Sequence, residues 1–431
     1  MLRSQKLLKA VKFPALLARY QSTAEQAAAK GKPLQIMSSA FVQKTKYIRT
    51  AFGDLYPDTT RGDIDMSSCD YLNYALHPYL NKIDGESIIR RGRISFNRSG
   101  CYVRPPASSV YRLEDAITEH TGGYQTCFVN SGTEANVAIF QAILENRPEL
   151  PIYLDKFSHA TMVLGANAAG RSDILTFKHN RLDHLRKMID ENGPGLIGVD
   201  SVYSAYGTVA PLEQLTELTR DTGSILLVDE SHTYGICGEH GEGVVKELGL
   251  EKDVHVRTMS TGKALGAGGG AIVLNEAVGD HIEDIRKGTR MSIFSLAPQD
   301  CIADRLLETL RLLKEEKWKR TDLYDKIKYF RESCMEMGYN GLFVKGETPI
   351  ITFVIGPVDM ATEMYKDFVE KQIFPSPHVY PASPRNRTAV RFTVCHGVTY
   401  EQLNHVLDTL RNLREKYKPE TWVDAQGIDL F

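Results

Sequence analysis

The most regular feature of the chain is a series of short apolar runs that alternate with amphipathic segments between residues 124 and 274. The apolar runs predict strands at 126–129, 152–154, 174–177, 195–199, 225–228 and 271–274. Intervening segments such as 182–192 and 212–222 carry apolar residues at helical spacing. Short, wholly apolar strands separated by helices are typical of a mainly parallel sheet covered on both faces. We therefore expect an α/β domain here.

Further elements are predicted on both sides of this series. Upstream, the sequence predicts a short strand over 66–72, a long loop rich in Arg, Ser and Gly over 86–110, and a helix from Ser109 to His120. Downstream, residues 303–338 are helical and charged. A smaller α/β domain is then predicted, with strands at 350–355 and 389–394 and helices at 360–371 and 400–417.

The first 24 residues differ in composition from the rest of the chain. They contain no acidic residue, and among leucines they carry the basic residues Arg3, Lys6, Lys9, Lys12 and Arg19. This composition is typical of a mitochondrial transit peptide, and the alternative is a basic disordered tail. We predict a transit peptide at 1–24 and a location in the mitochondrial matrix. The remainder divides into an N-terminal arm at 25–85, a large domain at 86–302 and a small C-terminal domain at 303–431.

Composition and charge exclude several classes of function. With 431 residues, 42% hydrophobic and 25% charged, the chain is an ordinary globular protein with room for two or three domains. A net charge of −2 gives no electrostatic case for nucleic acid or a membrane surface. No apolar run approaches the ~18 residues of a transmembrane helix. The seven cysteines are scattered without a C-x-x-C pair, which argues against zinc and disulfides and for a reducing compartment.

The first candidate functional residue is Lys263, which lies between the hydroxyls of Ser260 and Thr261 and a run of glycines. One interpretation is a glycine-rich surface turn with a solvated lysine. The other is a Schiff-base lysine beside an aldehyde cofactor, with Ser260 offered to its phosphate and glycines that allow close backbone approach.

Two other stretches follow predicted strands, where open α/β sheets bind ligands. Ser131, Gly132 and Thr133 begin a helix, so their N–H groups suit a phosphate; alternatively Ser131 simply caps the helix. His159 could stack on an aromatic cofactor ring or could be a polar loop residue.

A carboxylate and an arginine complete the candidate set. Asp229 directly follows the apolar run 225–228 and is either a helix cap or the partner of a protonated pyridine nitrogen, which makes pyridoxal phosphate (PLP) an electron sink. His232 could reach the phenolic oxygen of that cofactor or the substrate. Arg391, between Val390 and Phe392, could bind a substrate carboxylate or form a structural ion pair.

Together these stretches resemble the α-oxoamine synthase family, fold-type-I PLP-dependent enzymes that join an amino acid to an acyl-CoA with loss of CO2. The resemblance extends from about Met66 to Leu407. It rests on an ordered set of motifs: Ser67-Ser-Cys-Asp-Tyr-Leu72, Ser131-Gly-Thr-Glu-Ala-Asn136, Ser158-His-Ala-Thr161, Lys178-His-Asn180, Ser201-Val-Tyr-Ser-Ala-Tyr-Gly207, Val228-Asp-Glu-Ser-His232 and Ser260-Thr-Gly-Lys263 with Gly269-Gly270.

The resemblance implies a role for each matching position. Lys263 would bond to PLP and move protons at the substrate α-carbon, Asp229 would pair with the pyridinium nitrogen, and His159 would stack on the ring. His232 and Ser204 would contact the phenolic oxygen, and Arg391 would bind the amino-acid carboxylate. The phosphate would be held by Ser131, Gly132, Thr133 and Ser260. A homodimer with shared active sites is also implied.

The chain departs from the family pattern at substrate and interface elements. Cys69 replaces an asparagine, and Val110 stands where a histidine is expected. The glycine-rich loop is replaced around 95–101, and a hydroxyl-bearing F-S-T-S segment becomes Phe294-Ser-Leu-Ala297. The ring-binding set is intact, so we expect the PLP chemistry to be retained and the substrate to differ. The Asp-Glu-Ser-His sequence at 229–232 is similar to the corresponding segment in the family branch whose members make long-chain aminoketone signals.

Three functions are compatible with these observations. The favoured one is a decarboxylating C-acyltransferase acting on an amino acid and an acyl-CoA. A second is another fold-type-I PLP reaction without acyl-CoA, such as that of an aldolase, lyase or aminotransferase. A third is a non-catalytic partner subunit of a heterodimer, against which the presence of Lys263 argues.

Overall fold

The computed structural model describes residues 62–94, 99, 107–145, 147–339, 347–378 and 387–422. The predicted transit peptide and most of the N-terminal arm and of the 95–106 segment lie outside these residues. The chain divides into two units, 1–55 and 56–431, and all the described residues belong to the second.

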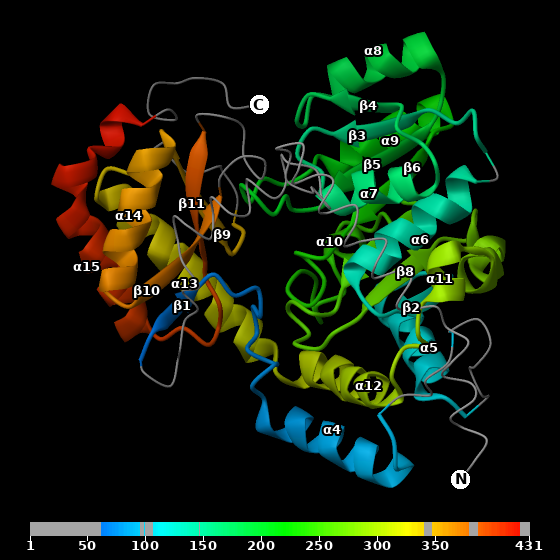
Figure 1. Ribbon diagram of the computed structural model, residues 1–431, viewed down its shortest axis with the longest axis horizontal. Helices are drawn as coiled ribbons and strands as arrows, with labels where there is room; N and C mark the ends of the chain where they lie inside the picture. Colours follow the sequence, from blue (N-terminus) through cyan, green and yellow to red (C-terminus); the bar gives the residue numbers. More distant parts are fainter. Residues whose placement is uncertain are drawn as a thin grey trace, which may run out of the picture. The chain divides into compact units, whose positions relative to one another are not determined.

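A seven-stranded sheet forms the larger part of this unit (Figure 1). Its spatial order is β2 (Gln125–Val129), β8 (Gly270–Leu274), β7 (Val256–Ser260), β6 (Ile225–Asp229), β5 (Leu196–Asp200), β3 (Ile152–Asp155) and β4 (Ile174–Phe177). Strands β3 to β7 run parallel, whereas β8 is antiparallel to both its neighbours. The prediction of a mainly parallel sheet is therefore confirmed.

Helices cover both faces of this sheet. Successive residues of a strand point to opposite faces, so each strand packs against helices on both sides. Leu154, Leu196 and Leu227 face α6 (Gly132–Leu144) and α7 (Ala160–Ala168). Their chain neighbours Tyr153 and Ile197 face the other side, covered by α8 (Leu182–Asn192), α9 (Leu212–Thr222) and α10 (Val244–Glu247). Both faces are buried, which is why these strands read as continuous apolar runs.

A second sheet of four strands has the order β1 (Ile64–Met66), β10 (Ile373–His378), β11 (Thr388–Thr393) and β9 (Ile350–Gly356). Helices α14 (Val358–Glu370), α13 (Lys317–Glu336) and α15 (Tyr400–Tyr417) pack with it around one apolar core. Helix α15 begins at a capping box, with Thr399 and Gln402 each bonding the other's backbone N–H. Figure 1 shows α14 and α15 beside strands β9 to β11.

The remaining elements connect these parts. They are α4 (Pro78–Arg91), α5 (Ser109–Thr121), α11 (Arg290–Phe294), α12 (Asp300–Glu315), the 3-10 helices η2 (Gly279–His281) and η4 (Pro419–Thr421), and the π-helix η3 (Asp284–Gly288). Helix α12 packs against both α4 and α5. Within the described residues, no helix combines the length and hydropathy that crossing a bilayer requires.

Three sequence expectations need correction. The strand predicted over 66–72 ends at Met66, because the Asp65 carboxylate accepts N–H groups of Ser67 and Ser68 and turns the chain. The first part of the loop predicted over 86–110 is the C-terminal half of α4, which ends at Gly92 with φ +65°. Strands β7 and β10 were not predicted, because Arg257, Ser376 and His378 interrupt their apolar pattern.

Candidate active site

Most of the predicted site residues gather in one cavity of about 200 Å³ at the carboxyl ends of the parallel strands. Asp229 ends β6 and Ser260 ends β7, so the sheet itself brings these side chains together. The lining includes eight of the residues singled out from sequence: Ser131, Gly132, Thr133, His159, Asp229, His232, Ser260 and Lys263. Asn136, Thr161, Asp200 and Ser231 also line it.

Lys263 and His232 form a hydrogen-bonded pair inside the protein. The Lys263 amine lies 2.9 Å from Nε2 of His232, and Nδ1 of the same ring lies 2.6 Å from the Tyr71 hydroxyl. Burial lowers the pKa of the Lys263 amine, although the Asp229 carboxylate opposes this shift. Burial, reinforced by Lys263, holds the pKa of His232 well below 6.5. Both groups are therefore biased toward their neutral forms.

Asp229 is held in a fixed orientation by neighbouring amides. Its Oδ2 accepts a hydrogen bond of 2.8 Å from Nδ2 of Asn136, whose own oxygen accepts from the Thr258 hydroxyl at 2.7 Å. Its Oδ1 accepts the N–H of Ser231 at 2.9 Å. Asn136 lies on the second turn of α6, where its side chain reaches across to β6. The carboxylate is thus aimed by a side chain of α6 and by the turn that follows β6.

A second carboxyl group lies beside Asp229. Asp200 ends β5 and pairs in register with Asp229 across the parallel ladder. Burial, and after it the charge of Asp229, raises the pKa of Asp200 well above 3.8. Asp200 accepts the N–H of His159 at 3.1 Å and thereby fixes the start of α7. The His159 ring is oriented by a 2.8 Å contact between its Nδ1 and the Thr161 hydroxyl.

The other end of the cavity is built from the start of α6 and the end of β7. The Ser131 hydroxyl caps the helix by accepting the N–H of Glu134 at 3.0 Å, so the capping interpretation is correct for that side chain. The N–H groups of Gly132 and Thr133 in the first turn have no intrahelical acceptor, which leaves them for an anion. A Cβ on Gly132 would lie 3.0 Å from that of Ser260, so the two segments approach closely here.

Arg391 and Ser204 lie outside the cavity lining. Arg391, on β11 of the small sheet, donates from Nη1 to the carbonyl oxygen of Ser204 at 2.7 Å, and its Nε is buried without a hydrogen-bond partner among the described residues. Burial is the main cause of the lowered pKa values of His232 and Lys263, and the Arg391 charge is a smaller cause that acts in the same direction. His396 instead contacts Asp322, with 2.6 Å between Nδ1 and Oδ2, consistent with a packing role.

Sequence reasoning missed Tyr71, Asn136 and Asp200 as site residues. Tyr71 and Asn136 stand within motifs already noted and Asp200 directly precedes one, but nothing in the local pattern distinguishes them from core residues. Strand pairing brings Asp200 to the cavity and the packing of α6 brings Asn136 there, whereas Tyr71 contacts the lining residue His232. No group of three His, Cys, Asp or Glu side chains suited to a metal ion occurs among the described residues.

The donor set of this cavity fits PLP. Free helix N–H groups and the Ser260 hydroxyl suit its phosphate, Lys263 suits its aldehyde and Asp229 suits its pyridine nitrogen. The flat His159 ring lies in the same lining.

Comparisons with known proteins show what the chain is similar to. The sequence profile of the family described as aminotransferase class I and II matches residues 99–410. The chain is 31% identical over 350 residues to the CAI-1 autoinducer synthase of Vibrio campbellii, covering 80% of this chain and 86% of that one. It is 26% identical over 364 residues to the 8-amino-7-oxononanoate synthase of Vibrio cholerae, covering 83% and 92%.

A solved structure shares the fold. The serine palmitoyltransferase of Sphingomonas wittichii superimposes with a TM-score of 0.75 at 22% identity, covering 83% of this chain and 88% of that one.

Proposed function

The chain belongs to the aminotransferase class I and II family, within its α-oxoamine synthase branch, and from this premise we propose its reaction. It is a PLP-dependent acyltransferase that condenses an amino acid with an acyl-CoA, releasing CO2 and free CoA thiol to give an aminoketone. The observation that carries this proposal is that Lys263 and Asp229, from separate strand ends, line one cavity with the anion-binding start of α6.

Bound PLP supplies an electron sink for bonds at the amino-acid α-carbon. Lys263 is the residue that would carry it, and the Lys263 Nζ is the group placed to take and return the α-carbon proton. The lowered pKa of that amine suits it to accept a proton. His232, 2.9 Å away, orients the amine through its ring nitrogen.

Arg391 provides the site for the carboxylate of the amino acid. Its guanidinium is anchored by the Ser204 carbonyl and retains a buried N–H at Nε without a partner among the described residues. A carboxylate accepting from this arginine would satisfy that donor and hold the α-carbon in one orientation. The reaction breaks the bond between that carboxylate and the α-carbon. This contact therefore determines which bond of the α-carbon is oriented for cleavage.

The first experiment is an absorption spectrum of the purified protein before and after borohydride, beside a Lys263→Ala variant. We expect a visible band from lysine-bound PLP that borohydride abolishes and that the variant lacks. Absence of the band after addition of PLP would refute the cofactor assignment and leave a non-catalytic subunit as the better explanation.

A second experiment separates this reaction from PLP reactions without an acyl donor. Amino acids are screened against acyl-CoAs of increasing chain length, and release of free thiol and CO2 is measured together. We expect both products in equal amounts and only when the acyl-CoA is present. Turnover of the amino acid without thiol release would support an aldolase, lyase or aminotransferase reaction instead.

We propose that residues 1–24 direct the protein to the mitochondrial matrix. The support is their composition, with five basic residues and no acidic one. A fluorescent protein carrying residues 1–24 is expected to enter mitochondria, whereas the same fusion with Arg3, Lys6, Lys9, Lys12 and Arg19 changed to Glu is not. Cytosolic fluorescence from the unaltered fusion would contradict this proposal.

We also propose that the protein acts as a homodimer. Phe294, the last residue of α11, and Leu296, two residues beyond it, are 84% and 57% exposed. The Leu296 carbonyl accepts from Asn130, which directly precedes the anion-binding start of α6. Two large apolar side chains exposed beside an active site favour coverage by a second copy. Light scattering of the wild type should give twice the chain mass, and Phe294→Asp should give the monomer.

A further inference from the structure

A second cavity, of about 230 Å³, lies at the opposite end of the large sheet. Its walls are Ile225 and Val256 at the amino ends of β6 and β7, Leu274 at the end of the antiparallel β8, and the last two turns of α6. Strand β6 rises about 3.3 Å per residue, so the four steps from Ile225 to Asp229 place the two cavities roughly 13 Å apart. We call this second one the amino-end cavity.

Aliphatic side chains dominate the amino-end cavity. Ile139, Val256, Leu274 and Ile285 are almost fully buried around it, so it extends the core rather than marking a shallow surface depression. Protein interiors rarely leave voids this large, and an engineered apolar cavity of about 150 Å³ already binds benzene. The space therefore suits an apolar ligand body.

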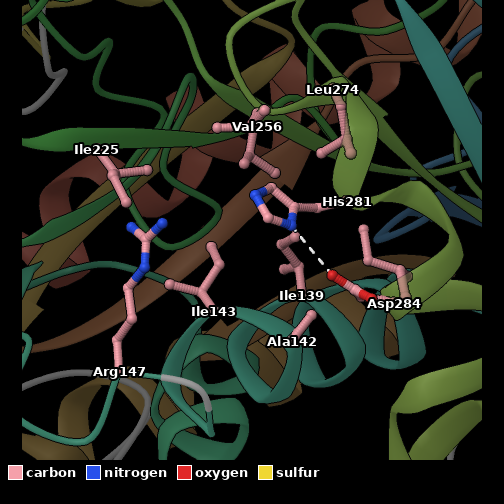
Figure 2. Close-up of a pocket in the computed structure, with 11 residues that line it drawn as sticks. Ile139, Ala142, Ile143, Arg147, Ile225, Val256, Leu274, His281 and Asp284 are labelled. Atoms are coloured by element: carbon pink, nitrogen blue, oxygen red, sulfur yellow. Dashed lines mark hydrogen bonds and ion pairs between the residues drawn. The ribbon is translucent and has the colours of Figure 1, made fainter.

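The charges at the rim select the head group of that ligand. Three lining residues are ionisable: Arg147, His281 and Asp284. Nδ1 of His281 lies 3.0 Å from Oδ2 of Asp284, so these two side chains are hydrogen-bonded to each other. The Arg147 guanidinium makes no hydrogen bond or ion pair with any residue that the structure describes. Figure 2 shows it extending along Ile143 toward Ile225, at the edge of the apolar wall.

We propose that the amino-end cavity binds a medium-chain alkyl monocarboxylate, with its chain against α6 and its carboxylate on Arg147. A single guanidinium matches one carboxylate in a two-bond geometry, whereas a phosphate dianion would call for further donors. The alkyl chain would leave water and occupy the apolar space between Ile143 and Val256. This site is independent of the proposed reaction, because none of its lining residues lines the cofactor cavity.

The test is calorimetric titration of the full-length, PLP-loaded protein with butanoate, hexanoate and octanoate, and with 1-octanol as the uncharged probe. Each added methylene is expected to tighten binding about fourfold if the chain is buried. Arg147→Gln should weaken octanoate binding roughly tenfold or more and leave 1-octanol unchanged. Ile143→Trp should abolish binding of both by filling the cavity.

Matched controls are Arg186→Gln, which removes an exposed arginine on α8, and Ile89→Trp, which changes an isoleucine that is 81% exposed. Both should bind octanoate as the wild type does. The proposal is overturned if octanoate does not bind, if its affinity does not depend on chain length, or if Arg147→Gln and Ile143→Trp both bind like the wild type. Competition by acyl-CoA would also overturn it, because the ligand would then occupy the active site.

Discussion

The hydroxyl of Tyr71 lies 2.6 Å from Nδ1 of His232, and this contact determines what His232 can offer to Lys263. Burial raises the pKa of Tyr71 well above 10, so the phenol keeps its proton. A neutral imidazole has one donor and one acceptor nitrogen. With Nδ1 accepting from the phenol, Nε2 carries the proton and lies 2.9 Å from the Lys263 amine, whose pKa is lowered by burial. Tyr71 is thus a positioning residue for the lysine.

Tyr71→Phe is expected to lower kcat/KM by about 10- to 100-fold, the effect of losing one buried hydrogen bond that orients a reacting group. The visible band of lysine-bound PLP should remain, because Lys263 is unchanged. Tyr329→Phe is the matched control, since the Tyr329 hydroxyl bonds Asn404 at the surface. Wild-type kinetics for Tyr71→Phe would show that His232 is oriented by other contacts.

Asn136→Ala should weaken PLP binding by about 5- to 100-fold, because Asp229 loses the 2.8 Å hydrogen bond that aims it. Asn136→Asp should be worse, since it places a second carboxylate against the first. The measurement is titration of the apoprotein with PLP. Asn192→Ala, at the surface end of α8, serves as the control. Equal affinities for the Ala and Asp variants would contradict the assigned role.

Arg391→Ala should raise KM for the amino acid by at least about 30-fold, because removal of a partner of a buried carboxylate is costly. KM for the acyl-CoA and the PLP band should change little. Arg391→Lys should recover only part of the loss, since an ammonium lacks the two-bond geometry. Initial-rate kinetics with each substrate varied separately provide the check. A larger rise in KM for the acyl-CoA would reassign the residue.

Asp200→Asn should stabilise the apoprotein increasingly as the pH rises from about 4 toward 8. The folded pKa of Asp200 lies above its unfolded value of 3.8, so in this window the folded protein binds more protons than the unfolded chain. Stability from Asp200 is therefore present at low pH and is lost as the pH rises through the folded pKa. Asparagine does not titrate. Thermal unfolding of both proteins across this range checks the sign, and a constant difference in Tm would contradict it.

Gly270→Ala should destabilise the protein by about 1–3 kcal/mol through overpacking. A Cβ on Gly270 would lie 2.3 Å from the Ser131 carbonyl oxygen and 2.7 Å from the Gly132 nitrogen, so the start of α6 would have to move. PLP affinity should fall as well. Gly268→Ala is a close control, because a Cβ there meets nothing within 4 Å. Chemical denaturation of both variants gives the comparison, and equal stabilities would show that the segment adjusts.

The architecture and most of the residues of the cofactor site could be predicted from the apolar and polar pattern of the chain. Fully buried parallel strands leave continuous apolar runs, so β2, β3, β4, β5, β6 and β8 and helices α8, α9 and α15 could be placed within a residue or two. Polar residues directly after such runs fall at one edge of the sheet, which is why Asp229, His159 and the start of α6 could be assigned to a common cavity.

The contacts that support those residues depend on how distant segments pack together. Asp200 becomes a partner of Asp229 because β5 and β6 pair in register, although 29 positions separate the two residues in sequence. Tyr71 reaches His232 across 161 positions. Strand β7 escaped prediction because Arg257 interrupts its apolar pattern, and that guanidinium donates to the distant carbonyl oxygen of Thr121. Strand β10 escaped prediction because Pro375, Ser376 and Pro377 interrupt its pattern. Such contacts depend on packing geometry, which the local pattern of apolar and polar residues does not encode.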